Sequence, residues 1–110
     1  MRLKTGTTQD GVQPAVWYAI GIAERIYAVE GCQLVITSLT DSKHMKDSFH
    51  YRGLAFDIRT RDLNANKLDI IYRNLLHALG PIGYDVILEK DHIHIEYDPK
   101  MNQNWQQTVS

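Results

Sequence analysis

The sequence predicts an α+β domain in which a small, mostly antiparallel sheet is covered by helices on one face. The hydrophobic pattern gives the order helix, strand, strand, helix, strand, strand, and a short turn joins the last two strands into a hairpin. The chain has 110 residues, of which 44% are apolar and 23% are charged. This size and composition predict a single globular domain that spans residues 1–110.

The first helix is expected from Pro14 to about Ala28. Proline is favoured in the first turn of a helix, and Gly31 is a typical residue just beyond the end of one. Residues 1–10 are mostly polar, and we expect them to form an irregular extension. The apolar residues that recur at helical spacing are Ala15, Val16, Ala19, Ile20, Ala23, Ile26 and Tyr27.

Two strands are expected in the middle of the chain. Gln33–Thr37 is short, apolar and rich in β-branched residues, which is typical of a buried strand. Ser38–Phe49 is polar and predicts a long loop. Gly53–Arg59 predicts the second strand, because larger apolar side chains alternate there with Ala55 and Asp57.

A second helix and a hairpin complete the domain. The helix is expected from Ala65 to Leu79, with Asn64 or Asn66 as its cap and Gly80-Pro81 as its stop. Its apolar stripe consists of Leu68, Ile71, Tyr72, Leu75, Leu76 and Leu79. The expected hairpin strands are Tyr84–Leu88 and His92–Tyr97, and residues 99–110 are expected to form a second irregular extension.

Charge and cysteine content exclude several classes of function. The formal net charge is −1, which gives no reason to expect a nucleic acid or an acidic membrane as partner. Cys32 is the only cysteine, so a metal ion would be held by His, Asp or Glu. The chain shows no signal-peptide pattern and no apolar run long enough to span a membrane, so we expect synthesis in the cytoplasm.

Histidines and carboxylates gather at the predicted strands. Strand alternation places His92, His94 and Glu96 on one face of the last strand. Asp57 interrupts an apolar strand, where a buried carboxylate is costly without a cation or several donors. His50 lies seven residues before Asp57, where the loop enters that strand. The loop and the strand can therefore bring both side chains to one point.

This residue set suits a catalytic zinc site. Two histidines and one carboxylate can bind zinc and leave a fourth position for water. A nearby carboxylate must then accept and return a proton, and either Asp91 or Glu89 could reach. Each residue also has a simpler interpretation: a lone strand histidine is more often structural, and Ser48 alone suits a turn. Glu96 suits either a solvated charge or a partner of a ligand histidine.

The combined pattern resembles a known family. Ser48–Asp57, SFHYRGLAFD, has the pattern S-x-H-x-x-G-x-A-x-D, and Asp91–His94, DHIH, has the pattern D-x-x-H. In this order the chain resembles the zinc D-alanyl-D-alanine peptidases (peptidase family M15), which include bacterial carboxypeptidases, vancomycin-resistance dipeptidases and phage endolysins. The hedgehog signalling domain shares their fold. The resemblance extends from about Pro14 to Pro99 and implies a hedgehog/DD-peptidase-like fold.

The resemblance also implies roles for individual residues. The implied ligands of one zinc ion are His50, Asp57 and His94. Asp91 matches the catalytic carboxylate, and His92 matches a histidine that supports the transition state or the substrate. Ser48 matches a serine near the substrate, and Gly53 a glycine that lets the chain pass close to the site. Glu89 remains the second candidate for the base.

One position departs from the family pattern. Many members carry an arginine in a T-S-G-x-R stretch, where it stabilises the oxyanion or binds substrate. Here the stretch Thr37–Asp41 reads TSLTD, so Asp41 stands in place of the arginine. Positive charge near a developing oxyanion contributes strongly to catalysis. The loss of the arginine therefore supports the alternative that this chain is a catalytically inactive relative of the peptidases. The candidate replacements are Lys43, Lys46, Arg52 and Arg59.

Two functions therefore stay open. The leading expectation is a zinc metallopeptidase that hydrolyses bacterial peptidoglycan stem peptides, at bonds of the D-Ala-D-Ala or L-Ala-D-Glu type, with Ser48 and Arg52 binding the substrate. A chain without a signal peptide would suit either a phage- or prophage-encoded lytic protein released to the cell wall or a small cytoplasmic dipeptidase. The alternative is a catalytically inactive module on the same fold that binds zinc or cell-wall peptides.

Overall fold

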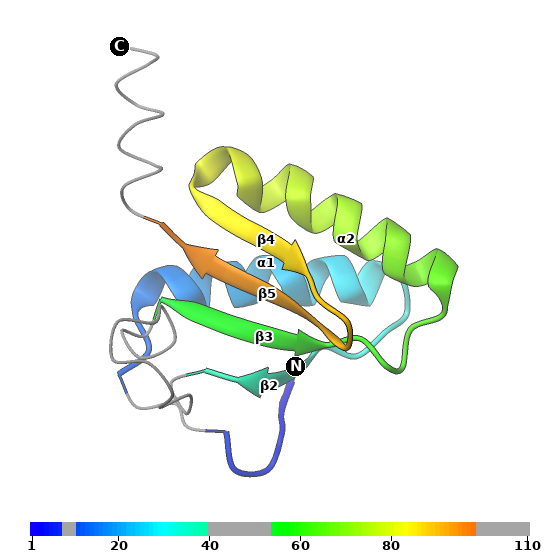
Figure 1. Ribbon diagram of the computed structural model, residues 1–110, viewed down its shortest axis with the longest axis horizontal. Helices are drawn as coiled ribbons and strands as arrows, with labels where there is room; N and C mark the ends of the chain where they lie inside the picture. The colour runs from blue at the N-terminus through cyan, green and yellow to red at the C-terminus, as the bar shows by residue number, and fades with distance from the viewer. Residues whose placement is uncertain (8–10, 40–53, 99–110) are drawn as a thin grey trace.

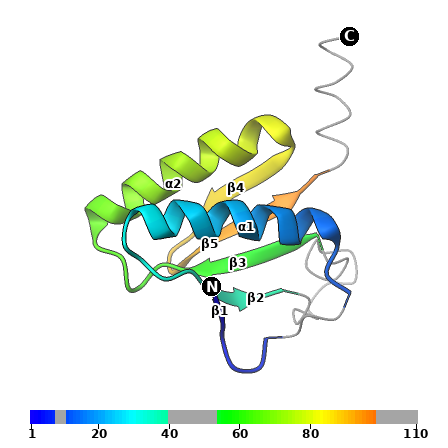
Figure 2. The ribbon, with the colours of Figure 1, turned by 180° about the vertical axis from the view of Figure 1, so that it is seen from behind.

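The structure is a computed structural model that describes residues 1–7, 11–39 and 54–98. A five-stranded sheet has the order β1-β2-β3-β5-β4, and two helices pack against one of its faces (Figures 1 and 2). The elements along the chain are β1 (Arg2–Leu3), α1 (Pro14–Val29), β2 (Val35–Ser38), β3 (Ala55–Arg59), α2 (Ala65–Leu79), the 3₁₀ turn η1 (Gly80–Ile82), β4 (Tyr84–Leu88) and β5 (His92–Tyr97). The predicted α+β class is confirmed.

Local signals account for the helix boundaries. Pro14 occupies the first turn of α1, and Gly31 follows the helix with a φ of 70°, a conformation that glycine adopts without a Cβ clash. The side chain of Asn64 accepts a hydrogen bond from the backbone N–H of Lys67 at 2.8 Å and caps α2. Asn64, rather than Asn66, is therefore the cap.

The core lies between the two helices and one face of the sheet. Ala19 and Ala23 of α1 and Leu75 of α2 are fully buried, and small alanines let α1 approach the strands closely. The hydroxyl of Tyr84 donates to the backbone oxygen of Ala15 at 2.7 Å, which ties β4 to the start of α1. Within the described ranges, neither helix combines the length and apolarity that crossing a lipid bilayer requires.

The start of the chain differs from the expected irregular extension. Arg2 and Leu3 form β1, which pairs in parallel with Val35 and Ile36 of β2. The backbone N–H of Lys4 also donates to the oxygen of Ile36 at 2.8 Å. A strand of two residues is too short to show alternation. It is stabilised by pairing with its partner strand, so its own sequence does not predict it.

Candidate functional site

The site is built on the face of the sheet opposite the helices. β3 and β5 are antiparallel neighbours, and their register places Asp57 directly opposite His94 and Arg59 directly opposite His92. The side chains between these residues point the other way and are fully buried: Phe56, Ile58, Ile93 and Ile95. Because a slip of one residue would move those apolar side chains into solvent, the core fixes the register that brings the polar residues together.

Asp57, His94 and Glu96 form a hydrogen-bonded row. Nδ1 of His94 lies 2.8 Å from Oδ1 of Asp57, and Nε2 of the same ring lies 2.6 Å from Oε1 of Glu96. The side chains of Asp57, His94 and Glu96 are 19%, 17% and 20% exposed. The hydrogen bond with Asp57 is the largest cause that raises the pKa of His94 above 6.5; Glu96 acts in the same direction, and burial opposes both.

This row meets the chemical requirements of a partial metal site. A neutral imidazole carries one N–H, yet both ring nitrogens of His94 face carboxylate oxygens. Both contacts are satisfied when the ring carries two protons, and also when a cation replaces the proton between Nδ1 and Asp57. When Glu96 accepts the hydrogen bond from the N–H at Nε2, the lone pair of Nδ1 points toward Asp57. Metal-binding histidines are commonly oriented in this way by a carboxylate that does not itself bind the metal. Asp57 and His94 are therefore suited to bind the same cation.

Asp91 and His92 form a second pair beside this row. Nδ1 of His92 lies 2.7 Å from Oδ1 of Asp91, and Nε2 of His92 lies 3.9 Å from Oδ1 of Asp57. The side chain of Asp91 is 84% exposed, and its hydrogen bond with His92 is the main cause that lowers its pKa. Asp91 is therefore ionised at neutral pH and can accept a proton.

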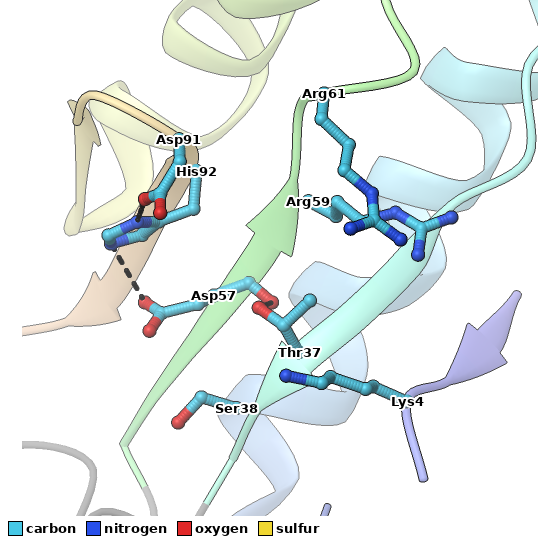
Figure 3. Close-up of a pocket in the computed structure, with 8 residues that line it drawn as sticks. All are labelled: Lys4, Thr37, Ser38, Asp57, Arg59, Arg61, Asp91 and His92. Atoms are coloured by element: carbon cyan, nitrogen blue, oxygen red, sulfur yellow. Dashed lines mark hydrogen bonds and ion pairs between the residues drawn. The ribbon is translucent and has the colours of Figure 1, made fainter.

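A cavity of about 330 Å³ adjoins both groups (Figure 3). The described residues that line it are Lys4, Thr37, Ser38, Asp57, Arg59, Arg61, Asp91 and His92. Glu89, the second candidate for the base, is exposed and does not line this cavity; its backbone N–H donates to the oxygen of His92 at 2.8 Å in the hairpin turn. Of the two candidates for the base, Asp91 is therefore the one that shares this cavity with Asp57.

Residues 17–97 match the hedgehog amino-terminal signalling domain. The chain belongs to this family. The match begins within α1 and ends with β5, so it includes Asp57, His94 and the Asp91–His92 pair. The hedgehog domain shares its fold with the zinc peptidases that the two sequence motifs resemble. The fold relationship to zinc hydrolases is thereby established for this chain.

Several expected site residues of this hedgehog-family chain lie outside the described ranges. They are Ser48, His50, Arg52 and Gly53, together with Asp41, Lys43 and Lys46. Residues 1–7, 11–39 and 54–98 contain no group of three His, Cys, Asp or Glu side chains arranged to hold a metal ion. Asp57 and His94 are two of the three ligands that the resemblance implies, and His50 is the third.

The structure also adds cavity residues that the sequence reasoning missed. Lys4 reaches the site because β1 pairs with β2, a contact without a local signal. Arg61 continues the outward alternation of Arg59 beyond the end of β3, and the buried Thr60 lies between them. The R-T-R pattern could have indicated a basic strand end facing the site.

Proposed function

We propose that this hedgehog-family chain is a zinc-dependent peptidase that hydrolyses peptide bonds in bacterial peptidoglycan stem peptides, of the D-Ala-D-Ala or L-Ala-D-Glu type. The observation that carries the proposal is the pairing of Asp57 with His94 at 2.8 Å, beside an ionised Asp91 at the edge of the same cavity. The resemblance of the Ser48–Asp57 and Asp91–His94 motifs to zinc D-alanyl-D-alanine peptidases supplies the substrate class.

The proposed zinc ligands are His50, Asp57 and His94. Zinc, when bound, would activate a water molecule and polarise the scissile carbonyl. Glu96 would hold the His94 ring so that Nδ1 faces the metal. These roles use the carboxylates around His94 without any rearrangement of the strands.

Asp91 would carry the proton during hydrolysis. Its carboxylate accepts a proton from the attacking water while the new C–O bond forms, and it then delivers that proton to the nitrogen as the C–N bond breaks. The products are a carboxylate and an amine. His92 is held through Nδ1 by Asp91 and, when protonated at Nε2, can donate to the oxygen that develops negative charge.

A second function is supported by two observations. The chain belongs to a family of signalling domains, and Asp41 stands where the related peptidases carry an arginine. The alternative is a catalytically inactive module that binds zinc or cell-wall peptides. Purified protein with one equivalent of zinc, incubated with muropeptides, separates the two functions.

The peptidase should release one new amino group for each bond cleaved, which amine labelling and mass spectrometry detect. The release should stop after chelation and return when zinc is restored. Zinc-loaded, folded protein that releases no amine from D-Ala-D-Ala or L-Ala-D-Glu peptides would contradict the peptidase and favour the binding module.

Glu96 offers a test of how the proposed metal site is oriented. Glu96→Ala removes the acceptor at Nε2 of His94, so we expect zinc affinity to fall roughly 10- to 100-fold, as is typical when the outer partner of a ligand histidine is lost. A competition titration with a zinc chelator measures this change. Asp85→Ala, which removes an exposed carboxylate directly opposite Glu96 on β4, is the matched control and should bind zinc normally.

Proton and zinc compete for Nδ1 of His94, which predicts a pH dependence. Because the folded state raises the pKa of His94 above 6.5, the protonated ring stabilises the zinc-free protein below that pH, and this stabilisation is lost as pH rises through the folded pKa. Zinc binding needs the deprotonated nitrogen. Apparent zinc affinity should therefore increase with pH, about tenfold per unit for each displaced proton.

Thermal unfolding from pH 5.5 to 8 measures this effect. The difference in Tm between zinc-loaded and zinc-free protein should grow as pH rises. A difference that stays constant across the range would show that no proton is displaced from the binding site.

A further inference from the structure

The wall of the cavity opposite Asp91 and His92 is basic. Lys4, Arg59 and Arg61 line this side, and we refer to them as the basic wall (Figure 3). Lys4 follows β1, whereas Arg59 ends β3 and Arg61 lies just beyond it. Three cations from two separate parts of the chain therefore face one cavity of about 330 Å³.

The charges of the basic wall are only partly compensated. Nη2 of Arg59 forms an ion pair with Oδ2 of Asp62 at 2.6 Å. In the described part of the chain, Lys4 and Arg61 have no ion-pair partner, and the buried Nε of Arg59 has no hydrogen-bond acceptor. Like charges placed together and a buried donor without an acceptor are both costly. An anion bound in the cavity would offset both costs.

The register sets the distance between the basic wall and the proposed reaction centre. Arg59 lies directly opposite His92, and these two residues form the next pair on the same face of the sheet as Asp57 and His94. Adjacent pairs on one face are separated by two residues, which is about 7 Å along a strand. This is about the length of two residues of an extended peptide substrate, so a group that binds the basic wall would lie within about two residues of the bond being cleaved.

We propose that the basic wall binds a carboxylate of the substrate peptide, positioned within about two residues of the scissile bond. This inference rests on the proposed peptidase function and adds a determinant of its specificity. The carboxylate could be the free C-terminus of a D-Ala-D-Ala peptide or the α-carboxylate of D-Glu within a stem peptide. Arginine pairs with carboxylates through two parallel hydrogen bonds, which gives geometric selection as well as charge.

Binding of three peptides tests the proposal and separates the two sources. The probes are N-acetyl-L-Lys-D-Ala-D-Ala, its C-terminal amide, and L-Ala-γ-D-Glu-L-Lys amide, whose only carboxylate is on D-Glu. Dissociation constants are measured by NMR titration of the zinc-loaded Asp91→Asn protein, in which hydrolysis is suppressed. We expect at least one carboxylate-bearing peptide to bind roughly tenfold or more tightly than the neutral-ended amide.

Arg61→Gln combined with Lys4→Gln should abolish this preference, whereas Arg73→Gln, which removes an exposed arginine of α2, should not. In the protein with native Asp91, the double variant should raise KM for the preferred peptide more than it lowers kcat. Equal binding of all three peptides, or a preference that survives in the double variant, would overturn the proposal.

The binding measurement also separates this inference from the peptidase proposal. If unmodified zinc-loaded protein cleaves none of the peptides, the peptidase fails, but a preference for the carboxylate that depends on Lys4 and Arg61 still supports the basic wall. If cleavage occurs and the neutral-ended amide is cleaved as well as both carboxylate-bearing peptides, the peptidase stands and the basic wall is excluded as a carboxylate site.

Discussion

Replacing His94 with alanine is expected to abolish stoichiometric zinc binding while the fold is retained. His94 faces Asp57 through Nδ1, and its side chain lies on the face of the sheet away from the core, so its removal leaves the packing of Ile93 and Ile95 unchanged. The binding free energy of structural zinc sites is about 10–16 kcal/mol. Loss of one of three or four ligands should therefore cost about 3 kcal/mol of that free energy, which raises Kd more than 100-fold.

The measurement is the zinc content after dialysis against a weak chelator, with circular dichroism to establish that the protein is folded. His77→Ala is the matched control, because His77 is an exposed histidine on α2. Asp57→Asn provides a second variant that keeps the size of the side chain and removes its charge. Normal zinc content in both His94→Ala and Asp57→Asn would exclude this pair as metal ligands.

Replacing Asp91 with asparagine is expected to lower kcat for peptide hydrolysis by roughly 10²- to 10⁴-fold, the usual contribution of a positioned acid or base. The amide keeps the size of the side chain but cannot accept the proton from water. Zinc content should be unchanged, because Asp91 contacts His92 rather than His94. The affected quantity should therefore be turnover rather than metal binding.

Glu89→Gln is the control for this variant, since Glu89 is the neighbouring carboxylate of the same turn and does not line the cavity. We expect it to retain nearly full activity. Hydrolysis that persists in Asp91→Asn and disappears in Glu89→Gln would move the role of the base to Glu89. Full activity in both variants would exclude each of them as the proton carrier.

Strong local signals explain which elements could be predicted. The Asn64 cap and the Gly80-Pro81 stop bound α2 from Ala65 to Leu79, and strict alternation gives β5 from His92 to Tyr97. These features depend on neighbouring residues along the chain. β1 was missed because its two residues are held by backbone hydrogen bonds to β2, which no local pattern reveals.

The sequence predicted that His92, His94 and Glu96 share one face of the last strand, and the structure shows this alternation, but the contacts of these side chains were not predictable. The sheet order places β5 between β3 and β4, and this arrangement sets His94 against Asp57. The sequence left two interpretations of Glu96 open, and the 2.6 Å contact with Nε2 of His94 identifies it as a partner of the histidine. Lys4 and Arg61 could not be assigned to the cavity, because their position depends on strand pairing and on the path of the chain after β3.

The most direct test of the zinc site is a crystal structure of the protein with one equivalent of zinc, with diffraction recorded at the zinc absorption edge. The anomalous difference map should show one peak between Oδ of Asp57 and Nδ1 of His94, at about 2.0–2.2 Å from each, with His50 as the third ligand and a fourth position open to the cavity. A map with no peak at this position, or with His94 still hydrogen-bonded to Asp57 while zinc binds elsewhere, would contradict the proposed site.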